Sequence, residues 1–384
     1  MDNYAFETVP KIHCEPGGAA RLGELCADRQ WRHVMVITDE GVRSAGLADG
    51  AIDSLRAHGM ETSVFSEVQA DPPEALVEEA VKAARSAGAD AVIGLGGGSS
   101  LDTAKLVALL CGTDQHLPDI YGIGFATGPR LPLVQIPTTA GTGSEATPIS
   151  IVTTPTHEKK GVVSPLLYPD MALLDAELTL GLPAPVTAAT GIDAMVHAIE
   201  AYTSKIKKNP ISDALATRAL GLLSANMDRV IAQSDDADAR SAMLQGSCLA
   251  GMAFANAPVG AVHALAYPLG GHFHVPHGLS NALVLPPVLA FNRPAAEPLY
   301  AELASCVLPN ERFDRAAEAC DAFIDFMTTL VQRMPFPHTL REVGVTEQDL
   351  EMLTTDAMKI DRLLVNNPRE VTYPDALSIY RTVL

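Results

Sequence analysis

The sequence predicts an α/β domain built on a parallel sheet, followed by an all-α domain. The first half alternates short β-branched runs with stretches of helical periodicity, whereas the second half has long helix-compatible segments and no convincing strand. The chain has 384 residues, of which 47% are hydrophobic, and at roughly 150 residues per domain this length corresponds to two domains.

Strand-like runs and helical stretches alternate in the first half. Strands are expected at His33–Thr38, Glu61–Val68 and Asp90–Leu95, with helices at Gly50–His58 and from Leu76 to Ala87. This β-α-β-α-β order is typical of a parallel sheet covered by helices on both faces. Shorter strands are expected at Leu133–Ile136, Ile149–Thr153 and Met171–Leu174.

The pattern changes near the stretch Leu180–Pro185, which contains one glycine and two prolines. We therefore predict domains at residues 1–181 and 182–384. Helices are expected in the second domain at Asp213–Leu223, Ser241–Ala255 and Arg315–Val331.

The chain is strongly acidic, with 46 acidic and 27 basic residues and a net charge of −19. This charge disfavours binding to nucleic acids and to anionic membranes. No apolar run approaches the length of a membrane span, and the first residues lack the features of a signal peptide. The six cysteines are dispersed, without a CxxC pair. We expect a cytoplasmic protein without nucleic-acid or membrane partners.

A glycine-rich loop, Gly94–Ser100, lies between a predicted strand and a helix at Leu101–Leu110. Glycines allow close backbone approach, and the free N–H groups of a helix start attract phosphate, so the loop resembles a pyrophosphate cradle. It departs from the GxGxxG pattern because Ser99 replaces the third glycine and the loop follows the third strand. The alternative is a tight turn in which Ser99 and Asp102 cap the helix.

A second loop, Pro137–Glu145, is rich in hydroxyl groups and glycines and also follows a predicted strand. Its hydroxyls are suited to hold ribose, phosphate or carboxamide groups without adding charge. A threonine-rich turn without a ligand is the alternative.

Asp193 and His197 are four residues apart in a helical stretch, which places a carboxylate and an imidazole on one helix face. Four of the eleven histidines fall between His263 and His277. An oxygen ligand with imidazoles suits Fe²⁺, Zn²⁺, Co²⁺ or Ni²⁺ better than Ca²⁺ or Mg²⁺. The alternatives are an ordinary acid–histidine pair on the helix, and histidines that cap turns around Gly270 and Gly271.

Four motifs occur in a fixed order: GLGGGSSLDTAK, PTTAGTGSEAT, GIDAMVHAIEAYTS and VHALAYPLGGHFHVPHG. Together they resemble the iron-containing (group III) alcohol dehydrogenase family, over nearly the whole chain. The resemblance implies a dinucleotide-binding α/β domain and an all-α domain, an architecture like that of dehydroquinate synthase, with nicotinamide cofactor and metal held between them. It also implies a homo-oligomer, a dimer or larger.

The resemblance also assigns residues to the two binding sites. It implies metal ligands at Asp193, His197, His263 and His277, and iron as the metal, with zinc as an alternative. It implies a pyrophosphate site at Gly96, Gly97, Gly98 and Ser99, with Asp102 near the nicotinamide and with Thr138, Thr139, Thr142 and Lys160 lining the cofactor site. Asp39 matches the position that binds the adenosine ribose, and a carboxylate there favours NAD over NADP; the alternative for Asp39 is a helix N-cap.

One position departs from the commonest family pattern. Tyr267 stands where several relatives carry a histidine that is suspected of relaying a proton, so that role is in doubt here. His272 and His274 offer imidazoles nearby, whereas a tyrosine with an ordinary pKa near 10 is a poorer proton shuttle at neutral pH. The candidate catalytic residues are therefore His263, Tyr267, His274 and His277.

The function implied is reversible hydride transfer between NAD(H) and a small alcohol or aldehyde whose oxygen binds the metal. Related superfamily activities are alternatives: glycerol dehydrogenase, hydroxyacid–oxoacid transhydrogenase, maleylacetate reductase or a dehydroquinate-synthase-like lyase. A non-redox metallohydrolase with a purely structural glycine loop is a more distant alternative, and a catalytically inactive scaffold would leave the metal-type residues without a role.

Overall fold

The computed structural model describes residues 3–156 and 158–384, which divide into two compact units. One unit spans Glu7–Gly181, and the other contains Leu182–Leu384 together with the described residues up to Phe6. The division falls between Gly181 and Leu182, inside the stretch where the sequence changes character. The grouping of the first residues with the C-terminal unit was not anticipated from the sequence.

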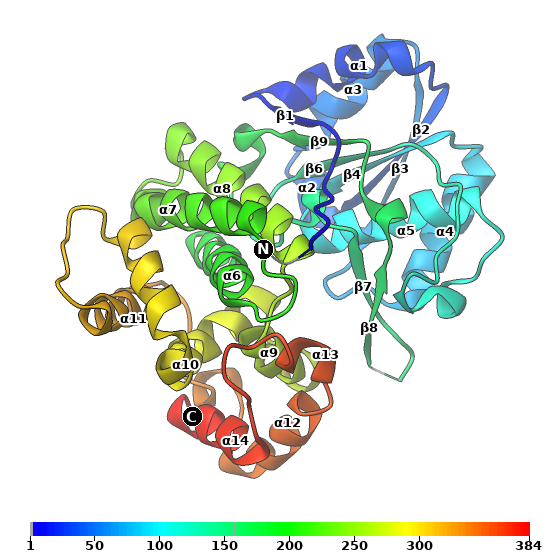
Figure 1. The fold of residues 1–384 in the computed structure, drawn as a ribbon. Helices are drawn as coiled ribbons and strands as arrows, with labels where there is room; N and C mark the ends of the chain where they lie inside the picture. Colours follow the sequence, from blue (N-terminus) through cyan, green and yellow to red (C-terminus); the bar gives the residue numbers. More distant parts are fainter. Residues whose placement is uncertain (1–2, 157) are drawn as a thin grey trace. The chain divides into compact units, whose positions relative to one another are not determined.

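A six-stranded sheet forms the centre of the first unit, and every neighbouring pair of its strands is parallel (Figure 1). The expected α/β class is therefore confirmed. The strand order is β1-β9-β6-β4-β2-β3, with bounds β1 Ile12–Cys14, β2 His33–Asp39, β3 Glu61–Val68, β4 Ala91–Gly96, β6 Leu133–Pro137 and β9 Met171–Leu174.

Helices cover both faces of this sheet, because its strands are apolar on both sides. Met35 and Ile37 of β2 join the core beneath α4 (Glu74–Ala87) and α5 (Gly98–Gly112). Val34 and Val36, which point the other way, join the core beneath the opposite helices. Those helices are α1 (Leu22–Leu25) and α3 (Asp49–Ala57), while the short α2 (Glu40–Ser44) directly follows β2.

A second, three-stranded sheet has the order β5-β8-β7, with β5 at Gly122–Ile123, β7 at Ile149–Thr153 and β8 at Lys159–Val163. The strand expected at Ile149–Thr153 is present, but it pairs antiparallel with β8 and not with the parallel sheet. Its alternating burial, in contrast to the fully buried β4 and β6, accounts for this placement. The short strands β1, β5 and β8 were not anticipated.

The C-terminal unit is helical, and its described residues contain no strand, as expected. Its helices are α6 Ala184–Thr203, α7 Pro210–Ala232, α8 Ala237–Asn256, α9 Ala261–Phe273, α10 His277–Val307, α11 Ala316–Gln332, α12 Leu350–Ala357, α13 Asp361–Leu364 and α14 Tyr373–Thr382.

Short 3₁₀ turns occur in both units, at Gly18–Arg21, Ala27–Arg29, Leu117–Ile120, Ser144–Ala146, Pro165–Leu167, Ala176–Thr179, Arg341–Val343 and Glu347–Asp349.

Helix α6 is the central helix of this unit and is buried almost all round. Two glycines allow other helices to approach it closely. A Cβ atom on Gly191 would lie 2.4 Å from the Met227 methyl group of α7, and one on Gly278 of α10 would lie 2.5 Å from the Ala189 carbonyl oxygen of α6. The start of α10 is therefore held directly against α6.

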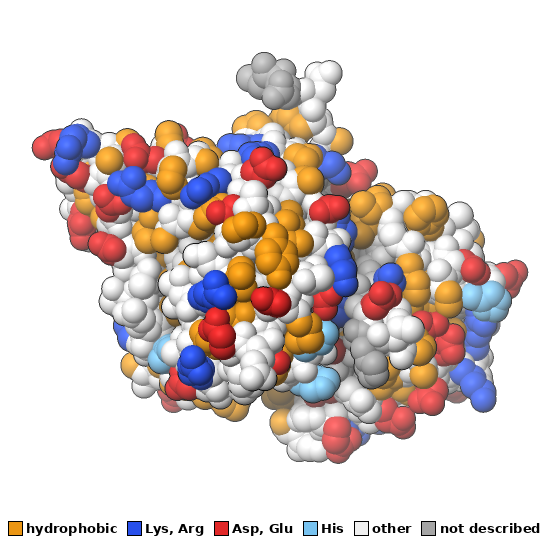
Figure 2. Space-filling view, turned by 90° about the horizontal axis from the view of Figure 1, so that it is seen from below, with side chains coloured by type: hydrophobic (Ala, Val, Ile, Leu, Met, Phe, Trp, Pro, Cys, Tyr) orange, Lys and Arg blue, Asp and Glu red, His pale blue; other side chains and the backbone are white. Residues whose placement is uncertain are grey.

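Over the described residues, no single helix is long and apolar enough to cross a membrane; only α8 and α9 together meet those criteria, as a pair bent by 105°. The molecular face drawn in Figure 2 carries basic side chains interspersed with acidic ones. Because the chain is acidic overall, an anionic ligand would depend on a local arrangement of positive groups.

Candidate metal centre and cofactor loops

Four potential metal ligands converge inside the C-terminal unit. Asp193 and His197 come from α6, His263 from the first turn of α9, and His277 from the first residue of α10. One ligand atom from each lies within 4.8 Å of the others. Asp193 Oδ1 is 4.0, 3.9 and 3.7 Å from the Nε2 atoms of His197, His263 and His277, respectively. The structure thus brings together the four residues that the resemblance implied.

The charge of this cluster suits a cation. Burial by itself would raise the pKa of Asp193, but the three nearby imidazoles and a hydrogen bond from Asn281 lower it below its usual value. The carboxylate is therefore ionised although its side chain is only 2% exposed. A buried anion with three imidazoles and no thiolate is a donor set for a borderline divalent ion such as Fe²⁺ or Zn²⁺, so the residues present fit the metal that the resemblance implies.

Asn281 is a further polar group at this point, and the sequence analysis missed it. Its Nδ2 atom lies 2.6 Å from Asp193 Oδ1 and 3.3 Å from the Nε2 atoms of both His263 and His277. Its Oδ1 atom is buried without a hydrogen-bond partner among the described residues. The available signal was the four-residue spacing from His277, which places both side chains on one face of α10.

Glu200 is a second residue that the sequence analysis missed. Its Oε2 atom lies 2.6 Å from His263 Nδ1, and its Oε1 atom accepts a hydrogen bond of 2.7 Å from the Val262 backbone N–H. This carboxylate therefore caps the start of α9 and turns the His263 Nε2 atom toward the cluster. Glu200 follows Asp193 by seven residues, so both lie on one face of α6, and that spacing was the signal in the sequence.

Aromatic packing fixes the ring of another potential ligand, His197. The His197 ring stacks on Phe254 with ring centres 4.3 Å apart, and on His263 with ring centres 4.7 Å apart. Because the ring is held between two flat neighbours, its orientation is set before any ion binds.

The remaining catalytic candidates differ in their position. The Tyr267 ring lies 5.8 Å from the His277 ring and 6.4 Å from the His263 ring. Burial raises the pKa of Tyr267 above its ordinary value, although Arg362 acts in the opposite direction. His274 is exposed and ends α9 with a left-handed backbone, and His272 is exposed and pairs with Asp356 at 2.7 Å.

Neither His272 nor His274 belongs to the group of converging ligands. Gly270 and Gly271 lie within α9, so the alternative of turns at these two residues is wrong.

The two candidate cofactor loops of the first unit, the glycine loop and the threonine loop, pack against each other. Gly96 ends β4, Gly98 starts α5, and the Thr138 N–H donates to the Gly96 carbonyl at 2.9 Å. A Cβ atom on Gly98 would lie 2.7 Å from the Thr142 methyl group, and one on Gly97 would lie 3.7 Å from the Thr139 methyl group. Ser99 belongs to the first turn of α5, where the sequence analysis expected a phosphate to bind the free N–H groups.

Asp39 lies beside the glycine loop, because β2 and β4 are parallel neighbours whose carboxyl ends lie side by side. Its Oδ1 atom caps α2 by accepting from the Val42 N–H at 3.0 Å. Its Oδ2 atom accepts from the Ser100 hydroxyl at 3.2 Å. The N-cap alternative is therefore correct, and the carboxylate also adjoins the loop.

A fully buried lysine joins the two loops, and the sequence analysis did not single it out. Lys105 Nζ lies 2.7 Å from the Ser144 hydroxyl and 3.5 Å from Asp102 Oδ1, and burial lowers the pKa of this lysine. Asp102 also accepts from the Ser144 hydroxyl and the Ile151 N–H. Lys160, by contrast, lies on β8 and pairs with Glu158 at 3.1 Å, and among the described residues it has no hydrogen bond or ion pair to the glycine loop.

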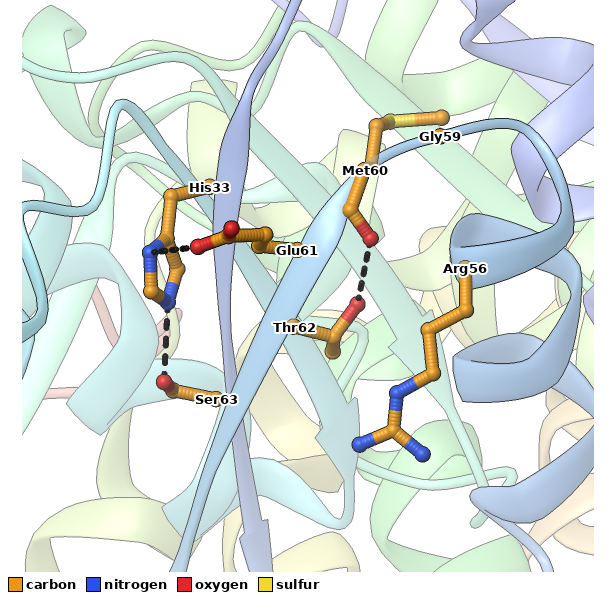
Figure 3. Close-up of a pocket in the computed structure, with 7 residues that line it drawn as sticks. All are labelled: His33, Arg56, Gly59, Met60, Glu61, Thr62 and Ser63. Carbon is orange, nitrogen blue, oxygen red and sulfur yellow. Dashed lines mark hydrogen bonds and ion pairs between the residues drawn. The ribbon is translucent and has the colours of Figure 1, made fainter.

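A surface hollow of about 500 Å³ lies at the amino ends of the strands β2 and β3, opposite to the glycine loop (Figure 3). His33 reaches the Ser63 hydroxyl at 2.8 Å and Glu61 at 3.4 Å there. Open α/β sheets bind ligands at the carboxyl ends of their strands, whereas this hollow lies at the amino ends. It includes none of the expected site residues.

Comparison with known protein families decides which group this arrangement belongs to. Residues 10–176 match the model of the iron-containing alcohol dehydrogenases, and residues 187–384 match the model of the C-terminal part of the same family. The chain is an iron-containing alcohol dehydrogenase. The resemblance inferred from the four sequence motifs is thereby confirmed.

Individual relatives of this alcohol dehydrogenase match it over nearly its whole length. It is 41% identical to long-chain-alcohol dehydrogenase 1 of Geobacillus thermodenitrificans over 355 residues, which cover 91% of this chain and 89% of the relative. A crystal structure of 1,3-propanediol oxidoreductase has a TM-score of 0.95 at 33% identity, covering 100% of both chains. The structure of sulfoacetaldehyde reductase from Bifidobacterium kashiwanohense, in complex with NAD⁺, has a TM-score of 0.90 at 28% identity and covers 100% of this chain and 99% of that one.

Proposed function

We propose that this alcohol dehydrogenase transfers hydride reversibly between NAD(H) and a small alcohol or aldehyde at a divalent cation. The proposed ligands of that cation are Asp193, His197, His263 and His277. The single observation that carries the proposal is the convergence of these four side chains from three helices around an ionised, buried carboxylate. Fe²⁺ is the proposed ion, with Zn²⁺ as a replacement, because the donor set lacks thiolate.

A divalent cation supplies polarisation of the substrate oxygen, and the nicotinamide supplies or accepts the hydride. The protein contributes orientation and charge. Glu200 holds the His263 ring so that Nε2 faces the cluster, and Asp193 provides the negative charge that balances the cation. His277 is the most exposed of the four ligands, at 32% of its side chain, so we propose that substrate reaches the cluster past this residue.

The cofactor is proposed to be NAD(H), bound where the glycine loop and the threonine loop pack together. The free N–H groups at the start of α5 would hold the pyrophosphate, as the sequence resemblance implies for Gly96, Gly97, Gly98 and Ser99. Asp39 would accept hydrogen bonds from the ribose hydroxyls and repel a 2′-phosphate. The NAD⁺ bound to the sulfoacetaldehyde reductase with the same fold supports this choice.

Further site roles are proposals of the same kind. Asp102, Thr138, Thr139, Thr142 and Lys160 are proposed to line the cofactor site. Of the proton-transfer candidates, Tyr267 is better supported by position than His274, because its ring adjoins two of the proposed ligands. The raised pKa of Tyr267 keeps its phenol neutral, so it would donate a hydrogen bond rather than act as a base.

The relatives act on long-chain alcohols, 1,3-propanediol and sulfoacetaldehyde according to their names, which supports a primary alcohol or an aldehyde as substrate. We also propose a cytoplasmic location and a homodimer or larger assembly. The acidic charge and the dispersed cysteines support the location. The homo-oligomer rests on the resemblance to the family.

The test is anaerobic loading with Fe²⁺ or Zn²⁺, followed by an assay of NADH oxidation with short aldehydes and of NAD⁺ reduction with the matching alcohols. The loaded protein is expected to turn over in both directions. His263→Ala is expected to abolish turnover while NADH binding, followed by its fluorescence, persists. Full activity of His263→Ala would remove the cation from the mechanism. His272→Ala, which changes a histidine of the same helix outside the cluster, is the matched control.

A further inference from the structure

The four proposed metal ligands are accessible from one side only. The side chains of Asp193, His197 and His263 are 2%, 5% and 3% exposed, whereas that of His277 is 32% exposed. A molecule that reaches the cluster therefore passes His277. Tyr267 adjoins His277 at a ring distance of 5.8 Å and so forms a wall of this approach.

The positively charged side chain of Arg362 lies next to Tyr267. The guanidinium carbon of Arg362, on α13, is 6.0 Å from the centre of the Tyr267 ring. Arg362 is exposed and has no acidic partner among the described residues. Arg293 and Arg381 of the same unit, in contrast, pair with Asp321 at 2.5 Å and with Glu347 at 3.0 Å, respectively.

Another cation near Arg362 in the sequence is already paired. Lys359 lies 2.6 Å from the Asp356 carboxylate. Arg362 is thus a guanidinium whose charge remains uncompensated in a chain of net charge −19. An arginine in this state is suited to bind a carboxylate, sulfonate or phosphate group through paired N–H donors.

The backbone beneath Arg362 is fixed. The Asn366 side chain donates to the Arg362 carbonyl at 3.1 Å and to the Val259 carbonyl, just before α9, at 2.9 Å. Asn367 and Asn292 exchange two amide hydrogen bonds of 3.0 and 2.7 Å. These contacts tie α13 to the helices that carry His263 and His277, so little order is lost when Arg362 binds a ligand.

We propose that Arg362 is a specificity-determining residue that binds an anionic group of the substrate, so that the enzyme prefers short aldehydes and alcohols with a terminal sulfonate or carboxylate. This inference rests on the proposed function, because it assigns a substrate class to the same site. The reacting oxygen would lie at the ligand cluster, and the acidic end of the molecule would extend past Tyr267 to the guanidinium.

The experiment compares substrate pairs of matched chain length in the metal-loaded enzyme: propionaldehyde with sulfoacetaldehyde, and butyraldehyde with succinic semialdehyde. The wild type is expected to have the higher kcat/KM for the anionic member of at least one pair, and the pair that responds distinguishes sulfonate from carboxylate. Arg362→Gln is expected to lower kcat/KM for that anionic member by about 10- to 100-fold, the usual worth of a hydrogen bond to a charged group. The neutral members should be unaffected, and Arg362→Lys should retain part of the preference.

The matched control is Arg218→Gln, which removes an exposed arginine on α7 that also lacks an acidic partner among the described residues. It should behave as wild type. The proposal is overturned if the wild type has the higher kcat/KM for the neutral member of both pairs. It is also overturned if Arg362→Gln lowers kcat/KM equally for both members of a pair. It is also overturned if Arg362→Gln weakens only NADH binding, because the arginine would then serve the cofactor.

A second measurement does not depend on turnover. Calorimetric titration with ethanesulfonate and with butyrate is expected to show binding to the wild type and weaker binding to Arg362→Gln, in protein whose unfolding temperature is unchanged. Equal binding of these anions by the wild type and by Arg362→Gln overturns the proposal of an anion site. Absence of any NADH-linked turnover in the wild type, with the difference in anion binding intact, would instead contradict the proposed function.

Discussion

Asp193 is an ionised carboxylate inside an apolar helical unit, and its neighbours explain why it is tolerated. Three imidazoles and the Asn281 amide surround it, and each of these groups interacts favourably with a negative charge or with a cation beside it. Glu200 is the second buried carboxyl group of the site, and it contacts both the His263 ring and the backbone at the start of α9. Substitutions of single residues at this site should therefore change metal affinity in ways that can be measured separately.

Glu200→Gln keeps the shape of the side chain but removes the charge that acts on His263. The affinity for Fe²⁺ or Zn²⁺ is expected to fall by about 10- to 100-fold, as for other carboxylates that orient a metal-binding histidine. Competition with a chelator measures this affinity. Glu318→Gln, which changes an exposed glutamate on α11, should leave the affinity unchanged. Equal metal affinity in Glu200→Gln and wild type would show that the carboxylate does not act on the metal.

Asp39→Asn separates the two roles of Asp39. Asparagine caps helices as well as aspartate does, so α2 should stay intact, but the negative charge at the proposed ribose position is lost. NADH should bind about tenfold more weakly, because a hydrogen bond to a charged acceptor is lost, while NADPH should bind better. Fluorescence titration with both cofactors, with the exposed Asp53→Asn as control, measures the two changes. Unchanged discrimination against NADPH would place the ribose elsewhere.

At the scale of elements, close approach of helices determines the geometry of the cluster. The start of α10 lies against α6 at Gly278, one residue after His277. The spacing of Asp193 and His197 could be read from the sequence because both lie on one helix. Glu200 and Asn281 share a helix face with Asp193 and His277, respectively, but their roles could not be assigned from the sequence. Glu200 acts on His263 and Asn281 on Asp193, and these partners lie on other helices whose packing no local pattern encodes. Lys105 was missed for the same reason, since its partners Ser144 and Thr147 belong to a distant loop.

Gly278→Ala tests this contact without changing a ligand. The new methyl group would approach the Ala189 carbonyl oxygen within 2.5 Å, so α10 must shift away from α6. Overpacking of this kind typically costs about 1–3 kcal/mol of unfolding free energy. Metal affinity should fall along with stability, because His277 moves with the start of α10.

Gly271→Ala is the control, since a Cβ atom at this α9 position meets no atom within 4 Å. Alanine should stabilise the helix by about 0.5–1 kcal/mol. Denaturant unfolding and chelator competition measure both variants. An unaltered metal affinity in Gly278→Ala, despite reduced stability, would contradict the link between helix packing and ligand geometry.

For the whole molecule, the sequence predicted the two structural classes but not every element. The apolar runs at His33–Thr38 and Asp90–Leu95 predicted the central strands β2 and β4, because fully buried parallel strands are apolar throughout. The run Glu61–Val68 predicted the edge strand β3, which is only partly buried and carries polar residues. The antiparallel pairing of Ile149–Thr153 was not predicted, because strand pairing depends on partners such as β8 that lack a hydrophobic signal of their own. The four sequence motifs were enough to predict the four converging residues. Glu200 and Asn281, which contact them, were recognised only in the structure.

Binding of one cation should stabilise the folded chain by mass action, by about 2.7 kcal/mol at a free metal concentration one hundred times the dissociation constant. The unfolding temperature should therefore rise on loading with Fe²⁺ or Zn²⁺ and fall again with a chelator. An unfolding temperature that does not respond to metal would contradict a specific site.

The most direct test of the central claim is the metal stoichiometry and affinity of the wild type and of Asp193→Asn, measured anaerobically by competition with a chelator. The wild type is predicted to bind one ion per chain, and Asp193→Asn, which removes the only charged ligand of the four, to bind it more weakly by more than about 100-fold. Asp238→Asn, an exposed change on α8, should match the wild type. Equally tight binding of one ion by Asp193→Asn would contradict the proposed centre.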